Sequence, residues 1–121
     1  MTIQIIGLLT LFSLMLASGQ TVFKMAARTS ESLVSVAGLT SLASNAWFWL
    51  ALVLYGGATL LWIYILQKIN LVQAYPFVAL GFILVPMAAV LFLGEKINIY
   101  YVGGTALILA GLWLITVKGG A

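Results

Sequence analysis

The amino-acid sequence predicts an all-α membrane protein, a bundle of four transmembrane helices forming a single domain over residues 1–121. Hydrophobic residues make up 64% of the chain, and only five basic and two acidic residues interrupt them. These charges lie near the ends of four long uncharged stretches, and about 20 apolar residues in a helix cross about 30 Å of hydrocarbon. We therefore expect transmembrane helices at residues 3–27, 46–67, 71–93 and 97–117.

The composition excludes several classes of protein. The sequence has no His and no Cys, and both of its acidic residues are Glu. Metal centres and nucleophilic triads need His, Cys or acidic clusters, so we expect no enzyme, no catalytic residue, no metal and no cofactor. The net charge of +3 comes from scattered side chains rather than from the dense basic patch that nucleic acids require. We expect no nucleic-acid partner.

The first apolar stretch has one alternative interpretation, a cleaved signal peptide. Ala17-Ser18-Gly19 resembles a small-residue processing site. Residues 1–4, however, carry no basic side chain, and the stretch is longer than a signal-peptide core of about 7–15 residues. We therefore expect it to remain in the protein as the first span.

Polar and basic side chains follow one face of this first helix. Ser13, Ala17, Gln20, Lys24 and Arg28 are separated by four, three, four and four positions, which places them on one helical stripe. One interpretation is that Lys24 snorkels from the edge of the interface to water. The other is that the stripe faces the bundle interior and binds a phosphate group, with Arg28 as a bidentate donor and Lys24 as a point charge.

The sequence marks both ends of the second span by a candidate cap and by aromatic residues. Residues 29–44 form the longest connection, and their apolar side chains fit either a short helix on the membrane surface or an extension of a neighbouring span. Asn45 is a candidate N-cap for the span that follows. Trp47 and Trp62, near its two ends, fit the aromatic belts found at membrane interfaces.

The third span contains two prolines. Asn70 precedes it with Gln73 three positions on, which is a capping-box arrangement. Pro76 and Pro86 each remove a backbone donor, and with Gly81 between them we expect this helix to be bent or locally unwound as a hinge. Such backbone is tolerated in a bilayer where protein or a water-filled cavity satisfies it. A packing kink and a cavity-lining hinge both fit.

The connection between the third and fourth spans carries Glu95. Counting crossings from the N-terminus places Glu95 on the same side of the membrane as Lys24 and Arg28, and Lys68 and Lys118 on the other side. Cations and an acid therefore assemble at one mouth of the bundle. A solvated ion pair there would contribute under about 1 kcal/mol. The basic residues are too evenly divided to orient the chain by the positive-inside rule.

The fourth span is rich in small residues. Asn98 is a candidate N-cap, and Gly104 and Gly111 are one heptad apart, so one face of the helix would allow close approach of another helix. We expect these glycines to serve helix packing. The partner helix could belong to the same chain or to a second copy.

Read in order, these segments resemble a known family. They are Gly19-Gln20 with Lys24, Leu61-Trp62-Ile63-Tyr64-Ile65-Leu66-Gln67, Val72-Gln73-Ala74-Tyr75-Pro76, Leu93-Gly94-Glu95 and the glycine-rich last helix. The chain is similar to small four-helix members of the drug/metabolite transporter superfamily, and in particular to the EamA-like subunits that flip aminoarabinose-phosphoundecaprenol. The similarity spans nearly the whole chain except residues 29–44, and implies a small multidrug resistance-like repeat.

The resemblance implies a flippase for a polyprenyl-phosphate-linked sugar in the bacterial inner membrane, serving lipopolysaccharide modification. Lys24 and Arg28 would hold the phosphate, Gln20 and Ser13 would offer neutral hydrogen bonds, and Glu95 would meet a sugar hydroxyl or amine. The candidate substrate-binding residues are Ser13, Gln20, Lys24, Arg28, Tyr75 and Glu95. Because a single chain holds one repeat, we expect a homodimer or a heterodimer with a related four-helix subunit, in contact with membrane lipids.

Two other functions remain open from the sequence. Small multidrug resistance exporters share the four helices, but they bind protons and cationic drugs through an acidic residue in the first helix, and residues 3–23 contain none. This departure argues against an exporter. A structural accessory subunit of a larger membrane complex would need no groove at all.

Overall fold

The computed structural model describes residues 2–119, which form helices and connections without a strand. The elements are α1 (Ile3–Thr29), α2 (Val36–Ala43), α3 (Ala46–Leu66), α4 (Leu71–Ala74), the 3₁₀ helix η1 (Tyr75–Leu80), α5 (Gly81–Leu93), α6 (Ile99–Leu114) and the π-helical turn η2 (Ile115–Gly119). Within residues 2–119, four helical segments are long and apolar enough to cross a membrane: Ile3–Thr29, Ala46–Leu66, Leu71–Leu93 and Ile99–Val117. The predicted fold class, an all-α bundle of four transmembrane helices, is confirmed.

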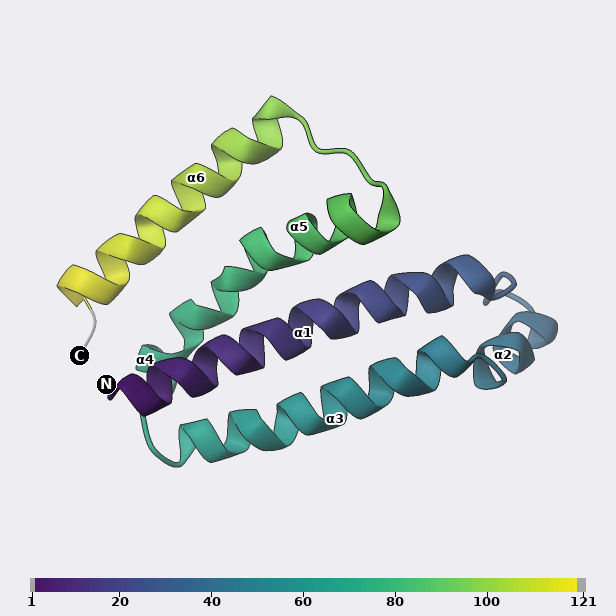
Figure 1. Ribbon diagram of the computed structural model, residues 1–121, viewed down its shortest axis with the longest axis horizontal. Coiled ribbons are helices and arrows are strands. Elements are labelled where there is room, and N and C mark those ends of the chain that lie inside the picture. The colour runs from purple at the N-terminus through teal and green to yellow at the C-terminus, as the bar shows by residue number, and fades with distance from the viewer. Residues whose placement is uncertain (1, 120–121) are drawn as a thin grey trace.

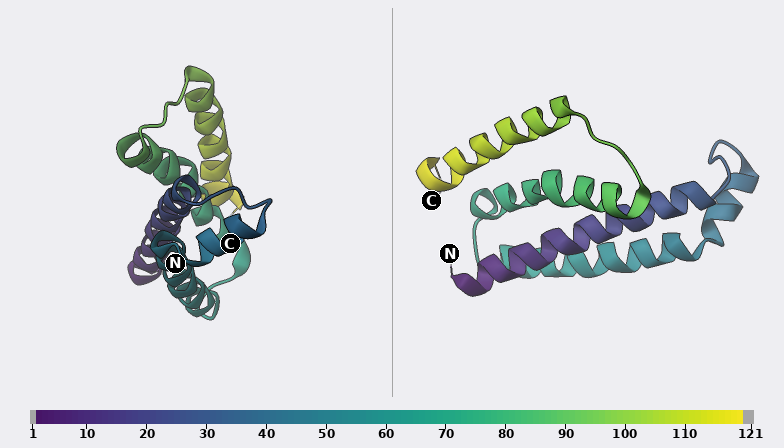
Figure 2. Two further views of the ribbon diagram at one scale, coloured as in Figure 1. Left: turned by 90° about the vertical axis from the view of Figure 1, so that its right-hand side faces the viewer. Right: turned by 45° about the horizontal axis from the view of Figure 1, so that its top comes forward.

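The helices α1 and α3 form the most closely packed pair. They run side by side and are joined by α2 at one end, while α5 follows the other flank of α1 (Figures 1 and 2). Their shared core is apolar, and within it the rings of Phe12 and Trp62 stack with centroids 4.7 Å apart. The chain starts α1 and ends η2 at the same end of the molecule (Figure 1).

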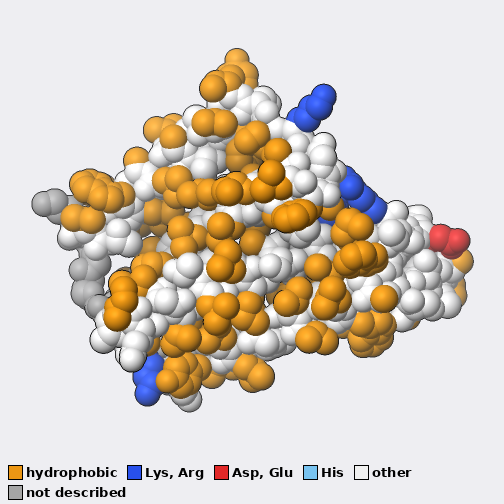
Figure 3. All heavy atoms as spheres, in the orientation of Figure 1, with side chains coloured by type: hydrophobic (Ala, Val, Ile, Leu, Met, Phe, Trp, Pro, Cys, Tyr) orange, Lys and Arg blue, Asp and Glu red, His pale blue; other side chains and the backbone are white. Residues whose placement is uncertain are grey.

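The outer surface matches a lipid environment. Hydrophobic side chains are spread over the whole face in Figure 3, and the charged side chains lie near its margins. In water such a surface would drive aggregation, whereas in a bilayer it faces hydrocarbon of similar polarity. The surface therefore agrees with the spans inferred from the sequence.

Asparagine side chains cap the helices as the sequence predicted. The Oδ1 atom of Asn45 accepts from the Trp47 amide at 2.9 Å. Its Nδ2 atom also lies within hydrogen-bond distance of the Ala26 carbonyl, the Thr29 hydroxyl and the Ser30 hydroxyl. Asn45 therefore ties the end of α1 to the start of α3 in addition to capping α3.

The other expected caps are also formed. The Asn98 side chain accepts from the Tyr101 amide at 2.9 Å and begins α6. Gln73 accepts from the Asn70 amide at 3.3 Å, as the capping-box pattern predicted. Within residues 29–44 the structure places the separate short helix α2, and Thr29 alone of these residues continues a neighbouring span, as the last residue of α1.

The third span departs from α-helical geometry around its first proline. The backbone is a 3₁₀ helix over η1, between Tyr75 and Leu80, and becomes α-helical again from Gly81. Pro86 lies inside α5 without ending it. The ring of Pro86 nevertheless deprives the carbonyl four positions earlier, that of Phe82, of its helical donor. The hydroxyl of Tyr101, in α6, donates to this carbonyl at 3.4 Å.

The last helix stands apart from the rest of the described chain. In Figures 1 and 2, α6 follows an extended connection and runs beside α5 with a clear separation. No residue of α6 is buried. A Cβ atom added at Gly104 or Gly111 would meet nothing within 4 Å. We considered a helix of the same chain or of a second copy as the packing partner of these glycines. Within residues 2–119, no helix of the same chain contacts them.

Candidate functional site

Lys24 and Glu95 face each other at one mouth of the bundle. The Lys24 Nζ and Glu95 Oε2 atoms are 4.0 Å apart, and the two side chains are 50% and 43% exposed. The sequence reached this pairing by counting crossings, and the structure brings the two residues together. Because both side chains remain half in solvent, the pair contributes under about 1 kcal/mol and is easily exchanged for other partners.

The backbone at Gly94 places Glu95 beside Lys24. Gly94 ends α5 with a φ of 69°, the left-handed conformation that a residue with a Cβ atom rarely adopts. The amides of Gly94 and Glu95 both point back to the Ala89 carbonyl, so they close the last turn of α5. The chain therefore reverses direction here, and the Glu95 side chain turns toward α1.

Arg28 binds the end of α5 in this conformation. Its Nη2 atom donates to the Leu93 carbonyl at 2.8 Å. That carbonyl belongs to the last turn of α5, where partial negative charge collects and a cation is favourable. A guanidinium has five N–H donors, so this contact leaves donors for a ligand. Arg28 therefore joins Lys24 and Glu95 at the same mouth.

Gln20 lies on the same stripe, one turn deeper than Lys24. Its Nε2 atom donates to the hydroxyl of Tyr55, from α3. The Tyr55 ring also contacts the Phe23 ring, with centroids 5.0 Å apart. Sequence reasoning missed Tyr55. A tyrosine in the middle of an apolar span needs a partner for its hydroxyl, and this signal could have found it.

Gly19 makes room for this arrangement. A Cβ atom at Gly19 would lie 2.5 Å from Tyr55 Cε2 and 2.8 Å from Cδ2, closer than real Cβ contacts. The tyrosine ring thus packs directly on the α1 backbone, next to the residue whose amide it accepts from. The adjacent Gly19 and Gln20 therefore act as one unit in positioning Tyr55.

Two of the candidate residues lie away from this mouth. Ser13 is 2% exposed, and its hydroxyl lies 3.0 Å from the Leu9 carbonyl and 3.1 Å from the Phe77 carbonyl in η1. Tyr75 is 62% exposed and begins η1, at the end of the third span opposite Glu95. The structure groups Gln20, Lys24, Arg28 and Glu95, and it places Ser13 and Tyr75 elsewhere.

Gly81 and Pro86, two of the three candidate hinge residues, line a recess beside Gln20. This recess has a volume of about 340 Å³ and lies between α1, the third span and α6. Its lining residues are Gln20, Val78, Gly81, Phe82, Val85, Pro86 and Tyr101. Gly81 and Pro86 therefore border a cavity, as one of the two interpretations of the hinge requires.

The described residues contain no group of three or more His, Cys, Asp or Glu side chains that could hold a metal ion. The polar chemistry at the mouth is that of two cations, one carboxylate and an amide. Such a set can bind an anion and a cation at the same time through charge-assisted hydrogen bonds.

Sequence comparison finds relatives with a common description. The chain is 37% identical over 83 residues, 69% of this chain and 72% of the relative, to the probable 4-amino-4-deoxy-L-arabinose-phosphoundecaprenol flippase subunit ArnE of Pseudomonas aeruginosa (strain LESB58). The chain belongs to the ArnE family. A Yersinia pestis (strain Pestoides F) ArnE relative is 40% identical over 70 residues, 58% of this chain and 61% of the relative. No family model matches the chain, and no solved structure does.

Membership of the ArnE family confirms the resemblance seen in the sequence motifs. Together with the four spans, it makes the chain a multi-pass integral protein of the bacterial inner membrane. The ArnE relatives are described as flippase subunits, which is a description of transporters.

Proposed function

We propose that this chain is one subunit of a flippase that moves a polyprenyl-phosphate-linked aminosugar, such as aminoarabinose-phosphoundecaprenol, across the inner membrane. The observation that carries the proposal is the grouping of Lys24, Arg28 and Glu95 at one mouth, with Gln20 one turn deeper on the same stripe. The ArnE relatives, whose names specify this lipid-linked sugar, support the choice of substrate.

The charges of the substrate complement those of the mouth. The lipid carries an anionic phosphate and its sugar a cationic amine. In the free protein Lys24 and Glu95 face each other at 4.0 Å. On binding, the phosphate takes the place of the Glu95 carboxylate on Lys24, and the amine takes the place of Lys24 on Glu95. Each charge then exchanges one partner for another, so binding leaves no charge unpaired.

Polar side chains on the stripe replace part of the hydration that the head group loses when it enters the bilayer. A phosphate or sugar that enters the bilayer without hydrogen bonds loses several kcal/mol, on the order of 4–8 for a polar group in an alkane. Gln20 and the Tyr55 hydroxyl supply polar atoms beyond the mouth. The four polar residues of the grouping act by non-covalent binding alone, and we infer no catalytic step.

The flippase works as a pair of four-helix units. The exposed face of α6, whose Gly104 and Gly111 have open space around them, is free for a second copy or a related subunit. The ArnE relatives are described as subunits, which supports an assembly. Ser13 and Tyr75 have separate roles in this proposal: Ser13 holds η1 against α1, and Tyr75 stands at the opposite interface.

The experiment that tests the proposal measures the sugar amine on the outer surface. Cells that make the lipid-linked aminosugar are treated with a membrane-impermeant amine-reactive reagent, and labelled lipid is quantified. A charge-assisted hydrogen bond contributes about 1.5–3 kcal/mol, so Lys24→Ala should lower the labelled fraction about tenfold to a hundredfold at limiting substrate. Lys68→Ala, at the opposite mouth, should leave it unchanged. Normal delivery by both Lys24→Ala and Arg28→Ala would overturn the proposal.

A further inference from the structure

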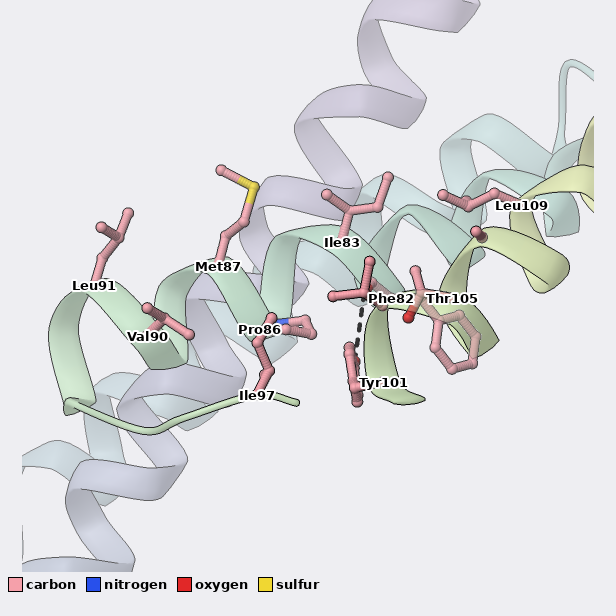
Figure 4. A pocket seen from close by; sticks show the side chains of 12 residues that line it. Phe82, Ile83, Pro86, Met87, Val90, Leu91, Ile97, Tyr101, Thr105 and Leu109 are labelled. Atoms are coloured by element: carbon pink, nitrogen blue, oxygen red, sulfur yellow. Dashed lines mark hydrogen bonds between the residues drawn. The ribbon is translucent and has the colours of Figure 1, made fainter. Parts of the chain in front are cut away.

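We propose that the apolar groove between α5 and α6 binds the polyprenyl chain of the substrate, so that the protein holds the lipid tail as well as its head. This inference rests on the proposed function, since it assigns a second part of the same ligand. The groove has a volume of about 470 Å³ and is drawn in Figure 4. Its lining residues are Phe82, Ile83, Pro86, Met87, Val90, Leu91, Ile97, Tyr101, Val102, Thr105, Ala106 and Leu109.

The groove carries no charge. Every side chain on the α5 wall is a hydrocarbon or a thioether, and on the α6 wall Tyr101 and Thr105 alone bear hydroxyls. The Tyr101 hydroxyl is directed to the Phe82 carbonyl, as the dashed line in Figure 4 shows. A phosphate or sugar would find few partners here. A hydrocarbon chain forms no hydrogen bonds, so it would lose none by entering the groove.

The groove adjoins the recess that contains Gln20. Phe82, Pro86 and Tyr101 line both cavities. The recess is therefore lined by the polar Gln20, whereas the groove is apolar, and the two share a wall. A ligand with a polar head joined covalently to a long apolar tail matches this order of polarity, which is why we choose the polyprenyl chain as the occupant.

The groove wall suits a methyl-branched and flexible chain. Met87 is unbranched and adapts its shape to a ligand, and Ala106 contributes only a methyl group to the lining. Within a bilayer the tail gains little from leaving lipid, because lipid tails are as apolar as the groove. The groove therefore acts through shape and position: it keeps the phosphate near the stripe while the head crosses.

The test uses the full chain in lipid nanodiscs with an undecaprenyl phosphate analogue that carries a photoreactive diazirine in its tail. After irradiation, cross-linked residues are mapped by mass spectrometry. We expect adducts concentrated on the groove residues of α5 and α6, and removed by excess undecaprenyl phosphate but not by phosphatidic acid. Adducts spread evenly over all spans, or equal competition by phosphatidic acid, would overturn the inference.

Two matched variants sharpen the test. Ala106→Phe fills the groove and should lower the groove adducts several-fold. Ala110→Phe makes the same change one turn away, at a residue that lines neither cavity, and should leave the adducts unchanged. If the two variants behave alike, the tail is not in this groove.

A helix of a second copy is the rival occupant. The chain has no native Cys, so Ala106→Cys introduces a single thiol. A disulfide-linked dimer formed on mild oxidation, in place of lipid adducts, would show that protein fills the groove and would overturn the inference. If Lys24→Ala abolishes delivery while adducts map outside the groove, the proposed function stands and the tail assignment falls. If groove adducts form although Lys24→Ala and Arg28→Ala deliver normally, the tail assignment stands and the proposed head-group site falls.

Discussion

The Tyr101 hydroxyl donates to the Phe82 carbonyl at 3.4 Å, and this contact compensates for a backbone donor that Pro86 lacks. Tyr101 belongs to α6 and Phe82 to α5, so the proline inside one helix creates the acceptor by which the next helix is attached. Because no residue of α6 is buried, this hydrogen bond is a specific polar tie between α6 and the third span.

Removal of the Tyr101 hydroxyl should therefore matter only while Pro86 is present. We expect Tyr101→Phe to lower the free energy of unfolding in detergent by about 0.5–1.5 kcal/mol. In a Pro86→Ala background, residue 86 regains an amide that can donate to Phe82, and the same change should cost much less. A double-mutant cycle by denaturant unfolding measures this coupling. Equal effects in both backgrounds would show that the hydroxyl and the proline act independently.

Gly19→Ala should displace Tyr55. The new Cβ atom would lie 2.5 Å from Tyr55 Cε2, so the ring must move and the hydrogen bond from Gln20 is lost. We expect lower delivery of the lipid-linked sugar at normal expression, and a change in the near-ultraviolet circular dichroism of the aromatic residues. Gly7→Ala is the matched control, because a Cβ atom there meets nothing within 4 Å. That change should be neutral or stabilising by up to about 1 kcal/mol.

Delivery of the aminosugar should depend on the guanidinium group of Arg28 and not only on its positive charge. It holds the Leu93 carbonyl at 2.8 Å and, in the proposed site, the phosphate. We expect Arg28→Ala to reduce outer-surface labelling of the aminosugar about tenfold or more, the equivalent of about 1.5–3 kcal/mol. Arg28→Lys should recover part of this loss, since lysine keeps the charge but lacks the planar fork. Full recovery by lysine would show that net charge suffices.

Expression of this protein should give no resistance to quaternary ammonium dyes. A cationic drug crossing the bilayer needs a buried acid, and the first span carries none between residues 3 and 23. Glu95 is 43% exposed and lies at the mouth rather than in the middle of a span. Growth assays against such dyes measure the outcome. Strong resistance that disappeared in Glu95→Gln would assign the chain to drug export instead.

Local features of the chain were predictable from its sequence. The lengths of the uncharged stretches determine how many helices cross the membrane, because each must satisfy its backbone hydrogen bonds internally. The caps at Asn45 and Asn98 depend only on residues two or three positions away. The meeting of Lys24 and Glu95 at one mouth followed from counting crossings, which needs no knowledge of packing.

The tertiary structure decided which faces of the helices meet. A stripe on α1 includes both Ser13 and Gln20, but the rotation of α1 against η1 buries Ser13, while Gln20 meets Tyr55. The same packing leaves Gly104 and Gly111 without a neighbour. Periodicity states which residues share a face, but in a bilayer lipid and protein are equally apolar, so hydropathy does not say which face turns inward. Only close packing between particular side chains and backbones makes that choice, and it depends on residues far apart in the chain.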